Sequence, residues 1–204
     1  MKKVLQKKIT KIRNKPSRKQ AEEAVKTLIK WAGDNPEREG LVETPKRVVN
    51  SYKEFFSGYD SKPEQILSKT FDEVEGYDEM VIVRDIAIES HCEHHMVPFI
   101  GIAHIGYIPN KRIVGISKLA RIADVFAKRL QTQEIMTAQI ADTINEVLKP
   151  KGVAVVIDAQ HQCMTTRGTH KTESSTITSR MLGLFRTNSN TRNEFMNLIN
   201  SVNS

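Results

Sequence analysis

Two stripes of apolar residues at helical spacing open the chain. The first stripe consists of Ala21, Ala24, Val25, Leu28 and Ala32, and the second of Val48, Val49, Tyr52, Phe55 and Phe56. Ser17 and Gln20 have the form of a capping box before the first stripe, and Thr44-Pro45 is typical of a helix start before the second. The pattern predicts two amphipathic helices, followed by a poorly patterned connector with a short helix near 64–68.

From residue 79 onward the pattern changes to β-branched runs. Strands are expected over 80–89, 99–108, 153–163 and 174–182, and helices over 117–130 and 132–147 with Ser117 and Thr132 as caps. A last helix should open on a capping box formed by Thr191 and Glu194. This order predicts an α+β fold with an antiparallel sheet, helices on one face and an N-terminal helical appendage.

The charge of the chain is concentrated at its start. The 204 residues carry a net charge of +7, and residues 1–19 hold nine Lys or Arg and no acid. The remainder has 22 basic groups against all 24 acidic groups, so it is close to neutral. We therefore divide the chain into a basic tail at 1–19, a helical region at 20–78 and a sheet-bearing domain at 79–204.

Such a basic block usually stays solvated and mobile, although a docking or RNA-binding arm is an open alternative. Because the basicity belongs to the tail, a nucleic-acid partner is not expected for the folded part. The tail lacks the apolar core of a secretory signal, and no apolar run approaches the ~18 residues of a membrane span. A cytoplasmic location is expected, where two cysteines are ligands or reduced thiols rather than a disulfide.

The only two cysteines both lie beside histidines. Cys92 is followed by His94 and His95, and Cys163, 71 residues later, is preceded by His161. Thiolate and neutral imidazole are ligands that Zn²⁺ prefers, and three protein ligands with one open position are typical of a catalytic zinc. The sequence therefore predicts a zinc site made of Cys92, His95 and Cys163, with a buried thiol beside packing histidines as the alternative.

Two thiolates would neutralise Zn²⁺, so a bound water would be acidified less than by three neutral histidines and a nearby base would be useful. His94 and His161, each close to a predicted ligand in sequence, are placed to transfer protons.

A second candidate site follows the first hairpin. Ser117 lies at a predicted helix start, with Lys118 and Arg121 on the first turns, and Arg167 follows the second cysteine. Helix N-termini and cations bind anions, so a phosphorylated substrate is one interpretation. A solvated helix face is the other interpretation.

Six segments together resemble the GTP cyclohydrolase I family, in its order and from about residue 20 to the end. They are Asn35-Pro-Glu-Arg-Glu-Gly-Leu-Val-Glu-Thr-Pro-Lys-Arg-Val48, Cys92-Glu-His-His95, Gly115-Ile-Ser-Lys-Leu-Ala-Arg121, Gln133-Glu134, His161-Gln-Cys-Met-Thr-Thr-Arg-Gly168 and Asn190-Thr-Arg-Asn-Glu-Phe195. The resemblance implies a tunnelling fold (T-fold) whose subunits pool their sheets into barrels and stack as a homodecamer, with active sites at subunit interfaces. It also implies that GTP and water become formate and 7,8-dihydroneopterin triphosphate, the first step towards folate or another pterin.

Carried over by motif, the family's functional residues fall on the candidates above. The resemblance implies zinc ligands at Cys92, His95 and Cys163, and proton transfer by His94 and His161. It implies guanine recognition by the Glu134 carboxylate with Gln133 beside it. It implies ribose and triphosphate contacts from Ser117, Lys118, Arg121 and Arg167.

One residue departs from the family pattern, because Leu130 stands where a proline is expected before the Gln-Glu pair.

Two rival hypotheses of function remain. One is a nitrile reductase with a cysteine nucleophile and a nicotinamide cofactor, and the other is a zinc-stabilised nucleotide- or RNA-binding module. Fe²⁺ can also occupy sites of this kind.

Overall fold

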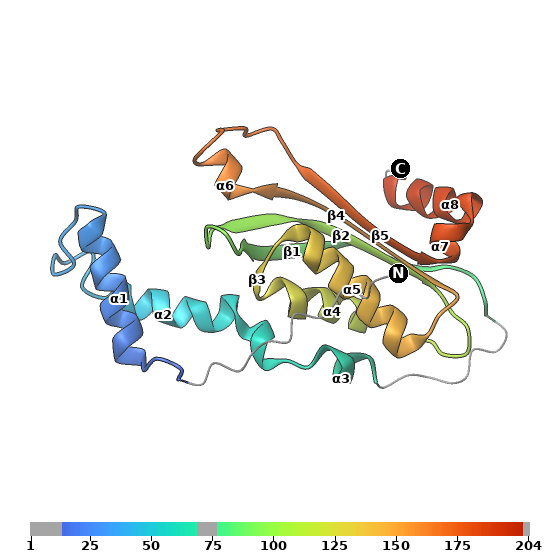
Figure 1. Cartoon of the computed structure of the whole chain (residues 1–204), viewed down its shortest axis with the longest axis horizontal. Coiled ribbons are helices and arrows are strands. Elements are labelled where there is room, and N and C mark those ends of the chain that lie inside the picture. The colour runs from blue at the N-terminus through green and yellow to red at the C-terminus, as the bar shows by residue number, and fades with distance from the viewer. Residues whose placement is uncertain (1–13, 69–76, 202–204) are drawn as a thin grey trace.

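The computed structural model describes residues 14–68 and 77–201. Most of the predicted basic tail and part of the connector therefore lie outside the described residues. Figure 1 shows a long curled sheet with helices packed along it and a pair of helices that projects from one end.

The helices and strands follow one another in an order typical of an α+β fold. The strands are β1 (Val81–Cys92), β2 (Pro98–Ile108), β3 (Leu130–Gln131), β4 (Gly152–His161) and β5 (Thr176–Gly183). The α-helices are α1 (Arg18–Trp31), α2 (Thr44–Phe55), α3 (Pro63–Leu67), α4 (Ser117–Ala127), α5 (Gln133–Leu148), α6 (Gln162–Thr165), α7 (Leu184–Thr187) and α8 (Ser189–Asn200), with a 3-10 helix at Ser57–Asp60. The predicted two hairpins are present, as is the short helix of the connector.

The sheet has the order β3-β1-β2-β4-β5. All neighbours are antiparallel except β1 and β3, which pair in parallel through His91 and Cys92. The prediction of a purely antiparallel sheet was therefore wrong at this edge. The chain reaches the edge after α4, which carries it back along the sheet so that β3 arrives in the same direction as β1.

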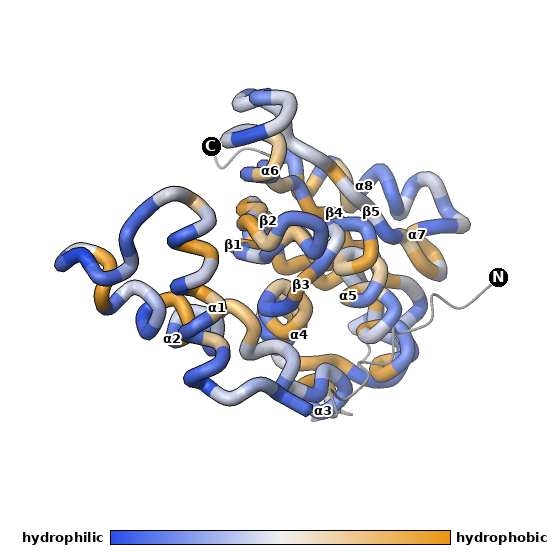
Figure 2. The backbone as a smooth tube through the Cα atoms, turned by 60° about the vertical axis from the view of Figure 1, so that its left-hand side comes forward, coloured by the Kyte–Doolittle hydropathy of each residue, from blue (hydrophilic) through white to orange (hydrophobic). Residues whose placement is uncertain are grey.

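The main core lies between the sheet and the helices α3, α4 and α5. Side chains that alternate along β1, β2 and β4 point to this face and pack on the apolar stripes of the helices. The largest of these buried residues are Tyr107, Phe99, Leu67, Ile88, Ile105, Leu119, Ile122, Met136, Ile140 and Ile144. Hydrophobic backbone segments gather along the sheet and these helices (Figure 2).

A second, smaller core lies on the opposite face of the sheet. Phe185 of α7 and Phe195 of α8 pack there against Val156 and its neighbours, and a Cβ at Gly106 would lie only 2.8 Å from the Phe195 ring. Arg84 of β1 donates to the carbonyl of Ser201 at 2.8 Å and so fixes the end of α8. The prediction that helices cover one face only was therefore wrong, because the C-terminal helix covers part of the other.

Helix α1 differs from the other long helices because it buries no residue. Its predicted capping box is confirmed, since Ser17 accepts from the Gln20 N–H and the Gln20 side chain accepts from the Ser17 N–H. Yet Leu28 is 64% exposed and Trp31 is 88% exposed. We call α1 and α2 the N-terminal arm, and residues 77–201 the sheet region.

One of the three predicted caps of the later helices is confirmed and two are wrong. Thr132 caps α5 as expected, with its hydroxyl accepting from the N–H of Ile135. Ser117 does not cap α4, because Ile116 before it already has helical backbone angles. The last helix begins earlier than predicted, because Asn188 caps it instead of Thr191. None of the helices in the described part of the chain has the length and apolar character needed to cross a bilayer.

Candidate metal centre and active site

The turn between β1 and β2 presents the first predicted metal ligands. The N–H of Cys92 donates to the carbonyl of Val97 at 2.9 Å, and the N–H of Met96 donates back to the carbonyl of Cys92 at 2.8 Å. Met96 has a left-handed backbone with φ of 55°, which closes the turn. This tight turn brings the His95 ring back over Cys92, where its Nδ1 lies 3.8 Å from the Sγ atom.

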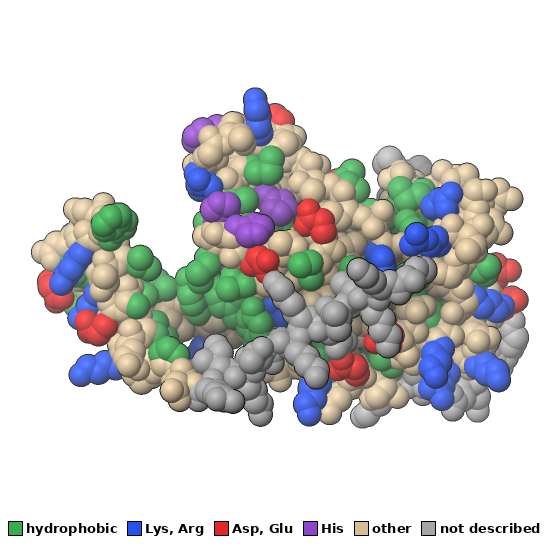
Figure 3. Space-filling model, viewed as in Figure 1, with side chains coloured by type: hydrophobic (Ala, Val, Ile, Leu, Met, Phe, Trp, Pro, Cys, Tyr) green, Lys and Arg blue, Asp and Glu red, His purple; other side chains and the backbone are tan. Residues whose placement is uncertain are grey.

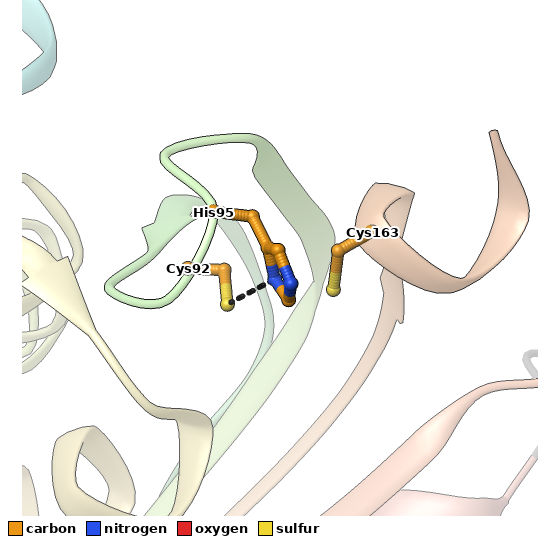
Figure 4. A group of neighbouring side chains, drawn as sticks. All are labelled: Cys92, His95 and Cys163. Carbon is orange, nitrogen blue, oxygen red and sulfur yellow. Dashed lines mark hydrogen bonds between the residues drawn. The ribbon is translucent and has the colours of Figure 1, made fainter. Parts of the chain in front are cut away.

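Cys163 reaches the same place from another part of the chain. It lies in α6, directly after β4, and the last residue of β4 pairs with Phe99 near the start of β2. The ligand atoms of Cys92, His95 and Cys163 all lie within 4.8 Å of one another, as a group that could hold a metal ion. Figure 4 shows the three side chains converging from the hairpin turn and from α6.

The donor set fits a zinc ion. Tetrahedral zinc with Zn–S bonds of about 2.3 Å separates two sulfurs by about 3.8 Å, which lies within the 4.8 Å that spans the three ligand atoms. Burial raises the pKa of the Cys163 thiol, and the neighbouring Cys92 raises it further. A bound dication would reverse this effect, because it favours the thiolate form of both cysteines. Cys92 is buried whereas His95 is exposed, so one side of the group faces solvent.

The two predicted proton-transfer histidines flank the metal group in different environments. His94 is exposed, and its Nδ1 lies 3.9 Å from the Cys92 Sγ. His161 is half-buried and stacks on the Phe99 ring, with centroids 4.6 Å apart and planes 7° from parallel. Burial lowers the pKa of His161, and the Glu134 carboxylate acts in the opposite direction. Figure 3 shows histidines gathered on the surface at this end of the sheet.

Three further predicted residues lie at the same end. Gln133 and Glu134 form the first turn of α5; Gln133 is 1% exposed, whereas Glu134 faces solvent. Arg167 follows α6 and is close enough to lower the pKa of Cys163, against the larger effect of burial. The structure therefore brings together a possible metal group, an imidazole, a carboxylate and a guanidinium.

The remaining predicted residues lie on α4, which begins at the opposite end of the sheet. The N–H of Val114, just before α4, donates to the Tyr107 hydroxyl, and Tyr107 pairs with Val81 at the start of β1. Only the other end of α4 approaches the metal turn, through β3. Its 11 residues span about 16 Å at 1.5 Å each. Ser117 and Lys118 thus lie about a helix length from the end of α4 that approaches the metal group of the same chain, and Arg121 lies part of the way along the helix.

A comparison with protein families gives a match over residues 21–200 to the model described as GTP cyclohydrolase I. The chain belongs to the GTP cyclohydrolase I family. Curated relatives named GTP cyclohydrolase 1 agree over nearly the whole length. The Maricaulis maris protein is 57% identical over 188 residues, covering 92% of each chain. The Hyphomonas neptunium protein is 59% identical, covering 90% of this chain and 89% of its own.

Family membership makes this chain an enzyme and confirms the predicted resemblance. Among solved structures, one titled as the archaeosine synthase QueF-Like in the apo form aligns with a TM-score of 0.41 and 13% identity. It covers 51% of this chain and 93% of that chain, and so low a score supports no assignment.

Some neighbours of the candidate site were not predicted from the sequence. Phe99, which stacks on His161, was expected as an ordinary strand residue. Thr178, which contacts the Gln133 amide, and Thr137, which contacts Thr178, carried no signal beyond their place in a strand and a helix. Leu130, the departure from the family pattern, donates its N–H to the Tyr59 hydroxyl at 3.1 Å. A proline could not make this bond, so the substitution is accommodated by a contact of its own.

Proposed function

We propose that this protein converts GTP and water to formate and 7,8-dihydroneopterin triphosphate, with zinc as its metal. The observation that carries the proposal is the convergence of Cys92, His95 and Cys163 beside His161 and Glu134, in a chain of this family. The reaction would be the first step towards tetrahydrofolate or another pterin. We infer a cytoplasmic location, where the two thiols stay reduced and available to metal.

Cys92, His95 and Cys163 would hold the zinc ion, leaving the fourth position towards solvent. A zinc ion there supplies a Lewis acid and an acidified water. Because two thiolates offset the charge of the metal, we assign proton transfer to His94 and His161 on either side of it. One histidine would protonate a nitrogen of the purine imidazole ring, which favours its opening to a formamide.

The Glu134 carboxylate is proposed to recognise guanine. Guanine presents N1–H and the 2-amino group as neighbouring donors, and an ionised carboxylate can accept from both. Its exposed position on the first turn of α5, next to the buried Gln133, leaves it free to face a substrate. Adenine lacks this pair of donors, so a site built on Glu134 should reject ATP strongly.

The triphosphate is proposed to contact Ser117, Lys118, Arg121 and Arg167. Arg167 lies beside the metal group, but Ser117 and Lys118 lie about a helix length away in the same chain, with Arg121 part of the way between. A complete site therefore needs α4 of a second copy, which supports a homo-oligomer with shared sites, and we propose the T-fold homodecamer of the family. Sedimentation that found a stable, fully active monomer would contradict this arrangement.

The test is to incubate zinc-loaded protein with GTP and to measure formate together with the absorbance and fluorescence of a pterin. Formate and pterin should appear in equal amounts. Cys163→Ser should lose metal and both products, whereas Met164→Leu in the same turn should keep them. GTP binding without formate would contradict the proposal and favour a nucleotide-binding module.

A further inference from the structure

The side-chain amide of Gln133 has an orientation that its neighbours determine. Its nitrogen lies 3.0 Å from the carbonyl oxygen of Ile157 and 2.7 Å from that of Thr176. Carbonyl oxygens only accept hydrogen bonds, so the nitrogen end of the amide must face them. The oxygen end must therefore point the other way.

Two threonines extend this network with a consistent direction. The Thr137 hydroxyl donates to the backbone carbonyl of Gln133, one helical turn earlier, at 2.7 Å. Since that proton is used, the Thr178 hydroxyl donates to Thr137 across the 2.7 Å contact between them. The Thr178 oxygen then lies 3.1 Å from the Gln133 amide nitrogen, as a third acceptor that must share one of its two N–H groups with the Ile157 and Thr176 carbonyls. Every donor in the chain of bonds has an acceptor, and the Gln133 oxygen is left for one further partner.

That partner is His161, whose Nε2 lies 2.8 Å from the Gln133 Oε1. An amide oxygen cannot donate, so Nε2 must carry the hydrogen. A neutral imidazole that donates from Nε2 has its lone pair on Nδ1. Stacking on Phe99 holds the ring plane at the same time, so the ring is fixed both by its face and by its edge.

We propose that Gln133 is a positioning residue that fixes His161 as the Nε2–H tautomer and presents Nδ1 as its proton-accepting nitrogen. The inference rests on the proposed function in taking His161 as a proton-transfer group. With 1% of its surface exposed, Gln133 serves the substrate site through His161 instead of through a side-chain contact with guanine. Hydrogen bonds that fix a histidine tautomer in this way are common behind functional imidazoles.

The first measurement uses the zinc-loaded wild-type protein with ¹⁵N-labelled histidine at a pH where the ring is neutral. Solid-state ¹⁵N spectra distinguish the two tautomers, and subtraction of a His161→Ala spectrum identifies the His161 signals. We expect a protonated Nε2 and an unprotonated Nδ1. The Nδ1–H tautomer at His161 would overturn the proposal without any further variant.

The second measurement uses Gln133→Met, which keeps the length of the side chain and removes its hydrogen bonds. We expect a mixture of His161 tautomers and a fall in kcat of about 10- to 100-fold, the usual cost of losing such a partner, with KM nearly unchanged. Gln65→Met, at an exposed position of α3, is the matched control and should keep the wild-type kcat. If Gln133→Met folds poorly, Thr178→Val, which removes one acceptor of the amide, should shift the tautomers in the same direction.

The outcomes separate this inference from the proposed function. A rise in KM with unchanged kcat in Gln133→Met would mean direct substrate contact and would overturn the positioning role. An unchanged His161 tautomer in Gln133→Met would overturn it as well. If the wild-type protein released no formate from GTP, the proposed function would fail, but the wild-type spectrum would still decide whether Gln133 sets the tautomer.

Discussion

The sheet region and the N-terminal arm bury their apolar side chains to very different extents. In the sheet region, α4 and α5 bury six and eight residues respectively, and both faces of β2 are partly covered. In the arm, α1 buries none and α2 buries only Pro45. Both regions have amphipathic helices, yet only one of them closes a core within a single chain.

The difference indicates where this chain depends on other copies. The sheet region holds the metal group and the His161 network by its own packing. In the arm, α1 has a complete capping box at its N-terminus, so the helix is well specified. Its Leu28 and Trp31 are nevertheless exposed, so its apolar side chains are not covered within the chain. An apolar stripe of this kind is usually buried against a partner, in agreement with the proposed oligomer.

The same substitution in each region should give the largest contrast. Leu119→Ala removes a side chain that is 0% exposed in α4, and should lower the free energy of unfolding by about 2–5 kcal/mol. Leu28→Ala removes one that is 64% exposed, and should cost less than about 0.5 kcal/mol in the dissociated chain. Urea unfolding at a protein concentration low enough for the chains to be dissociated measures both, and equal losses would remove the distinction between the regions.

Trp31→Ala should act on association instead of on folding. A tryptophan that is 88% exposed in the single chain but covered in an oligomer would contribute about 2 kcal/mol to assembly, or roughly thirtyfold in affinity. Trp31→Phe, which keeps an aromatic ring, should lose less. Sedimentation over a range of concentrations measures the effect, and unchanged assembly in Trp31→Ala would mean that the arm is not an interface.

Two arginine–aspartate pairs should show the smallest contrast. Arg180 of β5 donates from both Nε and Nη2 to the Asp142 carboxylate of α5, with side chains only 26% and 23% exposed, and a double-mutant cycle should give a coupling of about 1 kcal/mol. Arg38 and Asp34 in the loop after α1 are about half exposed, so solvent screening should make their coupling smaller than that of the more buried pair. Equal couplings would contradict the view that burial distinguishes the regions.

The arm pair should still be visible by titration. The Arg38 side chain holds the pKa of Asp34 at about 2, and a bond from the Asn35 N–H adds to this. Because the folded pKa is lower than the usual value, the small stabilisation is present above pH 3.8 and is lost as the pH falls towards 2. Arg38→Met should return the pKa of Asp34 towards its usual value, as measured by NMR titration of the carboxyl carbon.

The sequence predicted the regular elements of the fold because their apolar patterns are local. β-Branched runs located the four long strands, and helical stripes located α1, α2, α4 and α5. The edge strand β3 was missed because its two residues are specified by pairing with His91 and Cys92, not by a pattern of their own. The burial of both faces of β2 had a signal, since Ala103–Ile108 is almost continuously apolar, but alternation alone did not indicate α8 as the cover.

Sequence motifs predicted which residues form the candidate site, but not the hydrogen bonds that orient them. The spacing of Cys92, His95 and Cys163 led to three side chains that the structure brings together. The direction of the hydrogen bonds from Thr178 through Gln133 to His161 depends on side-chain geometry across α5, β4 and β5. No spacing rule in the sequence contains that information. The roles of the site residues in binding and catalysis stay predictions.

The most direct test of the account is X-ray absorption at the zinc edge of the metal-loaded protein. Ligation by Cys92, Cys163 and His95 predicts two sulfurs at about 2.3 Å and two nitrogen or oxygen atoms at about 2.0 Å. Cys163→Ser should reduce the sulfur count to one in whatever metal it retains. A zinc shell of nitrogen and oxygen alone, or of four sulfurs, would contradict the metal centre proposed for this chain.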